Sequence, residues 1–408
     1  MNNTLLAGIR ILDLSRLLPG PFCTLYLAQM GAEVIKIEEP DGGDYARGEV
    51  EMFALVNRGK QSITLDLRQP ADQAQFKALV KTADVVIESF RPGVMARFGC
   101  DYDSLKLINP KLVYAALTGY GQTGPYAKWA GHDMNYLAYA GVLDQIGTAR
   151  APALSNVQIA DLAGGALTCA MGILAAVIGA QKTGVGTMVD VSMMDGSMAL
   201  QAIGLSHLRT HGAASKRGSS MLTGALPNYA LYRCRDGKHL AVGALEPKFF
   251  LQLLKVLGEQ VPAPLMAGLT KAFALVTSRK GKRPKSGSDQ PKPKADPFAQ
   301  IQKLLTNPER ARLTLAPVRL ALQAVFLTKT RDEWARLLSD RDTCVAPILT
   351  LPEALQNEQA QARGMVQDDG GKPAFALPVR FSSPLPVMTA APALGADNAK
   401  LLGQKKRG

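Results

Sequence analysis

The sequence is short of the residues that build metal and redox sites. Of its 408 residues, five are cysteine and four are histidine. The cysteines, at positions 23, 100, 169, 234 and 344, lie far apart and never at the paired spacing of a zinc site or a thiol-exchange motif. An odd, scattered set of thiols is typical of a reducing compartment, and the N-terminus does not have the pattern of a secretory signal. We therefore expect a cytoplasmic protein without a metal site.

Phosphate-binding loops of the common kinds are missing as well. The first strand-to-helix turn, residues 16–21 (RLLPGP), has one glycine where a dinucleotide fingerprint has three, and its prolines lack the N–H donors that a pyrophosphate would use. No glycine-rich loop ends in Lys-Ser or Lys-Thr. NAD and nucleotide chemistry are thereby disfavoured. An organic acid-base or nucleophilic mechanism without a permanently bound cofactor remains.

Acidic residues are fewer than basic ones, 34 against 47, which gives a net charge of +13. Part of this surplus is local, because residues 278–294 hold seven basic residues and one acid, Asp289. This basic insert, which we take as residues 278–296, is rich in Ser, Gly and Pro and has almost nothing apolar to bury. It also lacks the interleaved aromatic residues of a nucleic-acid platform. We interpret it as a solvated loop and expect no nucleic-acid partner, although contact with RNA or a membrane is the alternative.

Residues 162–180 carry no charge, so a membrane span has to be considered. Four glycines and many alanines make the segment only mildly apolar, and no aromatic or basic belts flank both ends. A helix buried among close-packed neighbours is the better interpretation, and we expect no membrane partner.

The order of the expected elements predicts an α/β fold. Strands expected at 9–15, 33–38, 85–89, 112–118 and 188–193 alternate with helices, and the last strand leads to a single helix expected at about 195–208. This alternation is typical of a Rossmann-like, doubly wound parallel sheet. Functional residues are then expected at the carboxyl ends of the strands. A hairpin follows at 229–234 and 239–244, because Asp236-Gly237 suits a tight turn. We expect a large domain from 1–211 and 336–408 and a smaller α+β domain from 212–335, which contains the basic insert.

Three residues stand out as candidates for chemistry. His132 lies beside Asp133 in a glycine-bounded loop after a strand, and the alternative is a loop histidine that hydrogen-bonds its neighbours. Asp161 precedes the uncharged helix, where it could be an N-cap. Alternatively, because two glycines beside it let a ligand approach, it could be a base or nucleophile, while the free amides of the helix stabilise an oxyanion that develops on the substrate. Glu246, just after the hairpin, could orient an imidazole or be a surface carboxylate.

Seven segments together resemble the family III coenzyme A transferases (CaiB/BaiF type), and within them the α-methylacyl-CoA racemase branch. They are residues 12–21 (LDLSRLLPGP), 31–37 (GAEVIKI), 91–94 (RPGV), 118–125 (TGYGQTGP), 131–136 (GHDMNY), 159–162 (IADL) and 242–247 (VGALEP). The resemblance covers most of the chain. It implies a large Rossmann-like domain built from both chain ends, a smaller domain between them, and a homodimer whose two subunits interlock as rings.

The resemblance also implies roles for particular residues. Asp161 matches the acidic residue shared across the family, His132 matches a second acid-base group of the racemases, and Glu246 matches the acid that supports it. The residues implied to line the coenzyme A site are Leu17, Leu65, Arg68, Ser89, Phe90, Arg91 and Arg97. Departures occur at Glu39, where relatives often have an arginine near the adenine end, and at Thr223, which replaces an acid usual in the racemases. A third is at Gln158, near Asp161, where the racemases have an asparagine one residue earlier.

Three functions remain open at this point. The first is a racemase of 2-methylacyl-CoA thioesters, in which two bases on opposite faces remove and return the α-proton through an enolate. The second is a transferase that moves coenzyme A to a carboxylic acid through an anhydride on Asp161. The third is a protein that binds coenzyme A thioesters without catalysis, tethered to nucleic acid by the basic insert.

Overall fold

The computed structural model describes residues 4–277 and 308–403, so the basic insert lies outside the described residues. The chain divides into two compact units. Unit 1 contains residues 1–143, 154–201 and 357–408, and unit 2 contains residues 144–153 and 202–356. Each unit is described by itself.

Unit 1 is built on a six-stranded parallel sheet with the strand order β3-β2-β1-β4-β5-β6. The strands are β1 (Arg10–Asp13), β2 (Glu33–Glu38), β3 (Gln61–Thr64), β4 (Val85–Glu88), β5 (Val113–Thr118) and β6 (Met188–Ser192). The chain leaves β1 in one direction for β2 and β3, and then returns to the other side of β1 for β4. This reversal is a topological switch point, and it confirms the predicted doubly wound α/β sheet.

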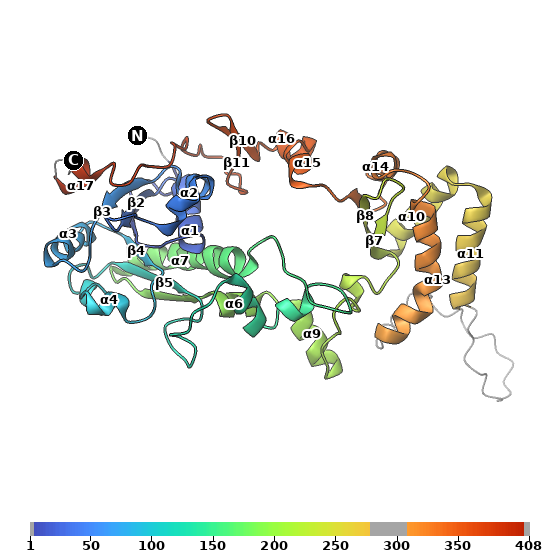
Figure 1. Cartoon of the computed structure of the whole chain (residues 1–408), viewed down its shortest axis with the longest axis horizontal. Coiled ribbons are helices and arrows are strands. Elements are labelled where there is room, and N and C mark those ends of the chain that lie inside the picture. The colour runs from blue at the N-terminus through green and yellow to red at the C-terminus, as the bar shows by residue number, and fades with distance from the viewer. Residues whose placement is uncertain (1–3, 278–307, 404–408) are drawn as a thin grey trace. The chain divides into compact units, whose positions relative to one another are not determined.

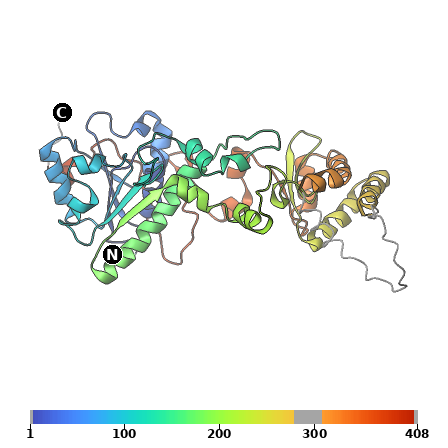
Figure 2. The same ribbon diagram turned by 90° about the horizontal axis from the view of Figure 1, so that it is seen from below.

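Helices cover both faces of this sheet (Figures 1 and 2). On one face, α1 (Pro19–Gln29) and α7 (Thr168–Thr183) pack against alternate strand residues such as Ile11 and Val85. On the other, α3 (Pro70–Val80) and the short α4 (Val94–Arg97) and α5 (Tyr102–Leu105) pack against Leu12 and Val86. Burial on both faces explains the nearly continuous apolar strands.

The remaining elements of unit 1 connect or flank the sheet. They are η1 (Tyr45–Gly48), α2 (Val50–Asn57), α6 (Asp133–Tyr139), η3 (Ala160–Leu167), α8 (Met193–Ala199), α16 (Glu358–Ala362), β10 (Val366–Asp369), β11 (Lys372–Phe375) and α17 (Asn398–Leu402), while η2 (Leu143–Gln145) begins in unit 1 and ends in unit 2.

Helices η3 and α7 form one continuous helical segment, Ala160–Thr183, that is long and apolar enough to cross a membrane by length and composition. Within unit 1, however, its residues Cys169, Ile173 and Val177 are buried in the apolar layer that also contains β-strand residues. Core helices of soluble domains have these same properties. The predicted burial therefore holds for one face of the helix only, since Met171 and Ile178 on the other face are exposed.

The C-terminal part of unit 1 closes the edge of the sheet at β3. The backbone N–H of Ser62 donates to Asp397 Oδ2 at 2.9 Å, and the N–H of Thr64 donates to Asn398 Oδ1 at 2.8 Å. Side chains at the start of α17 thus satisfy edge donors that would otherwise face solvent.

Unit 2 combines a three-stranded antiparallel sheet with helices (Figure 1). Its strands β7 (Tyr229–Arg233), β8 (His239–Gly243) and β9 (Val345–Pro347) follow the order β7-β8-β9, and the β7–β8 hairpin is as predicted. Trp334 and Phe326 are fully buried beneath this sheet. The helical elements are α9 (Ala202–His211), η4 (Met221–Thr223), α10 (Pro247–Gln260), α11 (Ala263–Thr277), α13 (Pro308–Phe326), α14 (Arg331–Leu338) and α15 (Leu351–Leu355).

Two local features differ from the sequence expectations. Strand β3 was not predicted, because it is a four-residue edge strand in which Gln61, Ser62 and Thr64 surround a single apolar residue. A single helix was expected from about Asp195 to Leu208, whereas the structure has α8 and α9, separated at Leu200 and Gln201.

Candidate functional site

Asp161 lies in an irregular turn at the start of the long helix. Residues 160–167 form a π-helix, η3, before the α-helical hydrogen-bond pattern begins at Thr168. Wide turns of this kind are rare and often occur at functional sites. The expectation that Asp161 is the N-cap is wrong, because Ile159 holds that position and Asp161 is the second residue of the helix.

The capping role belongs to Asp133 instead. Its Oδ1 accepts hydrogen bonds from the backbone N–H groups of Ala160, at 2.7 Å, and Asp161, at 3.0 Å. Asp133 is the first residue of α6, and His132 is the N-cap of that helix. The Asp133 hydrogen bonds therefore bring the loop that carries His132 to the turn that carries Asp161.

Those same hydrogen bonds correct a second expectation. Free amides at the start of the helix were expected to stabilise an oxyanion, but the Ala160 and Asp161 amides donate to Asp133. The next one, Leu162 N–H, donates to the carbonyl oxygen of Gln158 at 3.0 Å. A carboxylate already occupies the first two donors, so these three amides are not available to a substrate oxygen.

The surroundings of Asp161 favour its protonated form. Partial burial raises its pKa to about 7, and the neighbouring Asp133 carboxylate adds to the rise. A carboxyl group that titrates near neutral pH can both take and return a proton, which is the property that acid-base catalysis needs. His132 is exposed, with its backbone N–H donating to Asn135 Oδ1 at 3.0 Å.

Tyr136 connects Asp161 with a residue of the expected coenzyme A site. Burial raises the pKa of Tyr136 to about 12, the Asp161 carboxylate adds to this rise, and Arg91 opposes it. Both charges therefore lie within electrostatic reach of the Tyr136 ring. Its hydroxyl donates to Gly131 O, and Gly119 has to be glycine because a Cβ there would lie 2.3 Å from the ring.

Sequence reasoning missed an aromatic cluster around this tyrosine. Tyr120 is in edge-to-face contact with Tyr136 at 5.1 Å between ring centroids, and Tyr126 stacks on Trp129 at 4.2 Å. Tyr139 contacts both Tyr120 and Tyr126. A compositional signal was present, since residues 120–139 hold four of the ten tyrosines and one of the two tryptophans. The cluster forms an apolar wall beside the candidate acid-base residues.

Several residues of the expected coenzyme A site gather around one side chain, Arg16, which was not predicted. Its backbone N–H donates to Ser89 Oγ at 3.2 Å, and its guanidinium lies 5.0 Å from the centroid of the Phe90 ring. It also pairs with Glu39 at 3.2 Å. Leu17, the next residue, has a φ of 62° and donates its N–H to Asp44 Oδ1 at 2.9 Å. The carboxyl ends of β1 and β4 thereby meet at one place.

The other expected coenzyme A residues differ in accessibility. Arg91 and Arg97 are exposed, and Arg68 is exposed and pairs with Asp66 at 2.7 Å. The Leu65 side chain is only 2% exposed and packs in the core, so it can offer a ligand no more than its backbone. The surface arginines follow β3 and β4, where a parallel sheet of this kind binds ligands.

Buried ion pairs hold the loop between β1 and α1. Lys60 pairs with Asp13 at 3.2 Å, and Lys36 pairs with Asp44 at 2.8 Å, with all four side chains fully buried. Burial alone would raise the pKa of Asp13, but Lys60 and Lys36 together with two hydroxyl donors lower it to about 2. Because Lys36 Nζ also donates to Ser15 O and Lys60 Nζ to Pro21 O, the two lysines fix both ends of the loop.

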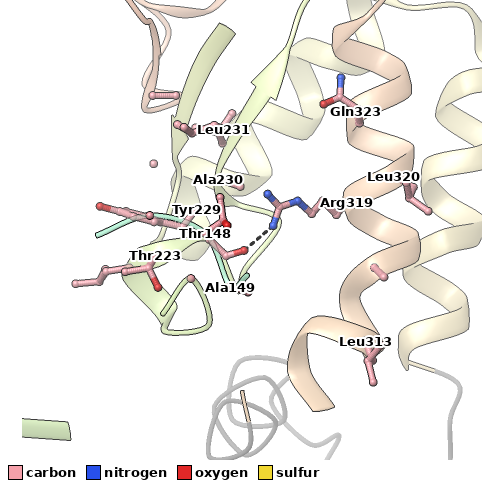
Figure 3. A pocket seen from close by; sticks show the side chains of 18 of the residues that line it. Thr148, Ala149, Thr223, Tyr229, Ala230, Leu231, Leu313, Arg319, Leu320 and Gln323 are labelled. Atoms are coloured by element: carbon pink, nitrogen blue, oxygen red, sulfur yellow. Dashed lines mark hydrogen bonds between the residues drawn. The ribbon is translucent and has the colours of Figure 1, made fainter. Parts of the chain in front are cut away.

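Glu246 belongs to unit 2, where it is the exposed N-cap of α10 and makes no side-chain capping hydrogen bond. Thr223, at the end of η4, lines a pocket of about 1040 Å³ in the same unit. Leu231, Leu313 and Leu320 form its apolar walls, and Arg319 reaches in from α13 and donates to Gly224 O at 2.6 Å (Figure 3). Such a pocket suits an apolar group with an anionic end.

Within the part of the chain that the structure describes, no group of three or more His, Cys, Asp or Glu side chains is arranged to hold a metal ion. Asp133 acts on Asp161 as a neighbouring carboxylate, and Asp161 in turn acts on Tyr136, which Arg91 also influences. Their chemistry is that of proton transfer or of nucleophilic attack by a carboxylate.

Comparison with known proteins agrees with this chemistry. The sequence model of CoA-transferase family III matches residues 6–279 and 290–398. The human alpha-methylacyl-CoA racemase is 33% identical over 407 residues, which cover 97% of this chain and 92% of that protein. The acetyl-CoA:oxalate CoA-transferase of Acetobacter aceti is 31% identical and covers 92% of this chain and 88% of its own.

A crystal structure of a CaiB/BaiF family protein from Brucella suis superposes with a TM-score of 0.79 at 28% identity, covering 98% of this chain and 99% of that one. Racemases and transferases are both enzymes of coenzyme A thioesters, and both kinds are among the relatives. The chain is an enzyme that belongs to CoA-transferase family III.

Proposed function

We propose that this enzyme is a racemase of 2-methylacyl-CoA thioesters that works by 1,1-proton transfer through an enolate. One of the pair His132 and Asp161 takes the α-proton, and the C–H electrons move into the enolate. The other then delivers a proton to the opposite face of the same carbon, which inverts the centre. No atom other than the proton is exchanged, so no second substrate is needed.

The observation that carries the proposal is the pairing of the two loops by Asp133. Asp133 accepts a hydrogen bond from the backbone N–H of Asp161, whose carboxyl has a pKa of about 7, and His132 directly precedes Asp133 in the sequence. A carboxyl and an imidazole can each take and return a proton, and a two-base mechanism requires this of both groups, since each has to serve as acid in one direction and as base in the other.

Coenzyme A binding is proposed for the residues at the carboxyl ends of β1, β3 and β4. Arg68, Arg91 and Arg97 are exposed cations suited to the phosphates, and Arg16 adds a guanidinium held against Phe90. Leu17, Ser89 and the Leu65 backbone complete the site that the resemblance implies. The coenzyme enters as part of the substrate and leaves with the product.

Two further features rest on the family resemblance alone, and a third rests on the scattered cysteines and the N-terminal sequence. Glu246 is proposed to support His132, and its carboxylate is free of a capping bond that would compete. The chain is proposed to act as an interlocked homodimer. Its place of action is proposed to be the cytoplasm.

A second function has its own support. An Asp161 whose pKa is raised is also a stronger nucleophile, and it could attack a thioester carbonyl, release coenzyme A as the thiolate and hold the acyl group as a mixed anhydride. The thiolate would then attack the Asp161 carbonyl of the anhydride, which releases the donor as its carboxylate and leaves a thioester on Asp161. An acceptor carboxylate would attack that thioester to form a second anhydride, and the thiolate would attack its acceptor carbonyl, which yields the new thioester and frees Asp161. The identity to the oxalate transferase favours this alternative, but it gives no role to His132.

The test is hydrogen exchange at the α-carbon of 2-methylacyl-CoA in deuterated water, with no acceptor acid present. Deuterium should enter with the wild type and not with His132→Ala or Asp161→Asn, each checked for folding by circular dichroism. Absence of exchange in the wild type, together with an acyl group trapped on Asp161 by hydroxylamine, would reject the racemase and establish the transferase.

A further inference from the structure

A second concave site in unit 1 has an unusual set of charges. It is a pocket of about 590 Å³ between the end of α2 and the chain that follows α16. Three arginines line it, Arg58, Arg363 and Arg380, together with the carboxylates of Asp368 and Asp369. None of these residues belongs to the proposed coenzyme A or acid-base groups.

Arg58 is the distinctive member, because it is only 4% exposed. One guanidinium nitrogen, Nη2, donates to Phe375 O, but Nε is buried and has no hydrogen-bond partner. Burial lowers the pKa of Arg58, and the Asp369 carboxylate offsets only part of this. Taking a guanidinium out of water without an anionic partner is costly, so a buried arginine in this state indicates a place that an anion fills.

The other two arginines are exposed and have no carboxylate partner among the described residues. Arg380 Nη2 makes a long contact of 3.4 Å with Ala362 O, and it lies 3.8 Å from the place that a Cβ on Gly364 would occupy. Arg363 is the C-cap of α16. Planar guanidinium groups converging from separate segments are the usual way in which proteins bind a phosphoryl group or another oxyanion.

The two acids do not neutralise this arrangement. Asp368 Oδ1 accepts the Gly371 N–H at 3.1 Å and so belongs to the β10–β11 turn. Asp369 acts on Arg58 through its charge but is not in ion-pair contact with it. Three cations thus face two anions, and Asp369 would repel an incoming anion.

We infer that this pocket is an anion site for the phosphoryl group of a small molecule, separate from the thioester site. A bound phosphoryl group would link Arg58, which precedes the buried Lys60, to the C-terminal segment that carries Arg363 and Arg380. Met388 and Thr389 of that segment already contact Gly59, so the ligand would fasten two parts of unit 1 that touch at this place.

The test measures the binding of inorganic phosphate by isothermal titration calorimetry. It also measures the rise in Tm that phosphate causes, relative to sodium chloride at the same ionic strength. The double variant Arg363→Gln/Arg380→Gln should bind phosphate about tenfold more weakly or worse and lose the rise in Tm. Both residues are exposed, so this variant should fold. The charge-matched control is Arg150→Gln/Arg209→Gln, two exposed arginines of unit 2, which should bind as the wild type does.

A variant with the opposite sign sharpens the test. Asp369→Asn removes the repelling carboxylate and should tighten phosphate binding. Equal binding by the wild type and by Arg363→Gln/Arg380→Gln would overturn the site. Displacement of phosphate by one equivalent of coenzyme A would refute the claim that the two sites are separate, because the pocket would then be part of the thioester site. These outcomes do not depend on whether the enzyme is a racemase or a transferase.

Discussion

Asp133 acts on Asp161 in two ways at once. Its Oδ1 fixes the backbone of the π-helical turn, and its charge helps to keep the Asp161 carboxyl protonated up to about pH 7. The first effect needs only an acceptor oxygen, whereas the second needs the negative charge. An asparagine at this position retains one effect and loses the other, so the two can be separated.

Asp133→Asn should lower the pKa of Asp161, because a repelling carboxylate disappears while an amide oxygen still accepts the two backbone hydrogen bonds. If the ionised Asp161 is the base, the ascending limb of the pH-rate profile, near pH 7 in the wild type, should move to lower pH. The profile of kcat for thioester turnover checks this. A limb that stays in place would show that Asp161 is not the group that titrates.

Asp161→Asn should reduce turnover by about a thousandfold or more, since the amide can neither take a proton nor attack a thioester. The same variant should be more stable than the wild type. A carboxyl whose folded-state pKa is raised costs stability progressively as the pH rises from about 4 through about 7, and asparagine removes that cost. The gain in Tm should therefore be larger at pH 8 than at pH 5. An equal gain at both would contradict the raised pKa.

Single residues also show what sequence can and cannot predict. Asp161 and His132 could be proposed because each stands in a short motif that resembles a family. Asp133 lies in the same motif as His132, yet its partners are 27 and 28 residues away, and no spacing rule connects them. Arg16 and Arg58 were missed for the same reason, since only the fold shows what a side chain contacts.

Among the elements, the π-helical turn depends on its contact with α8. Gly164 and Gly196 lie back to back, and a Cβ on Gly196 would be 1.9 Å from the backbone oxygen of Gly164. Nothing larger than a hydrogen atom fits there. This close approach positions the turn that carries Asp161 against a neighbouring helix.

Gly196→Ala should therefore destabilise the protein by about 1–3 kcal/mol through overpacking against a backbone atom, and it should lower turnover by displacing Asp161. Gly179→Ala is the matched control in α7, the helix that continues from the π-helical turn, because a Cβ there meets nothing within 4 Å. That variant should stabilise the helix by about 0.5–1 kcal/mol without changing turnover. Urea unfolding together with the exchange assay measures both, and equal effects of the two variants would refute the packing argument.

Elements with a strong pattern were predictable, and those without one were not. The apolar strands β1, β2, β4 and β5 and the Asp-Gly hairpin of β7 and β8 have local signals that agree with their environment. Strand β3 is specified by pairing with β2, and the π-helical turn by contacts with α6 and α8, which are tertiary causes without a local signature. The division of residues 193–211 into two helices was missed for a similar reason, since no proline or glycine stands at Leu200 and Gln201.

At the scale of the whole molecule, the family match is interrupted at residues 280–289, inside the basic insert. The family match resumes directly after this gap, so the residues shared with the family lie outside residues 280–289. Deletion of residues 278–294 should leave kcat and KM for the thioester within about twofold of the wild type, while the net charge falls by six. A collapse in turnover that accompanies an unchanged Tm would show that the insert takes part in catalysis.

The side chains of Asp397 and Asn398 that cover strand β3 also set a condition on synthesis. Strand β3 is made early, and the residues that satisfy its outer edge emerge more than 330 positions later. During that interval the nascent chain carries an open strand edge of the kind that templates aggregation. We therefore expect the growing polypeptide to need this edge shielded until Asp397 and Asn398 are made. A chain cut before Asp397 should keep the six strands of the parallel sheet but leave the outer edge of β3 without these two hydrogen bonds.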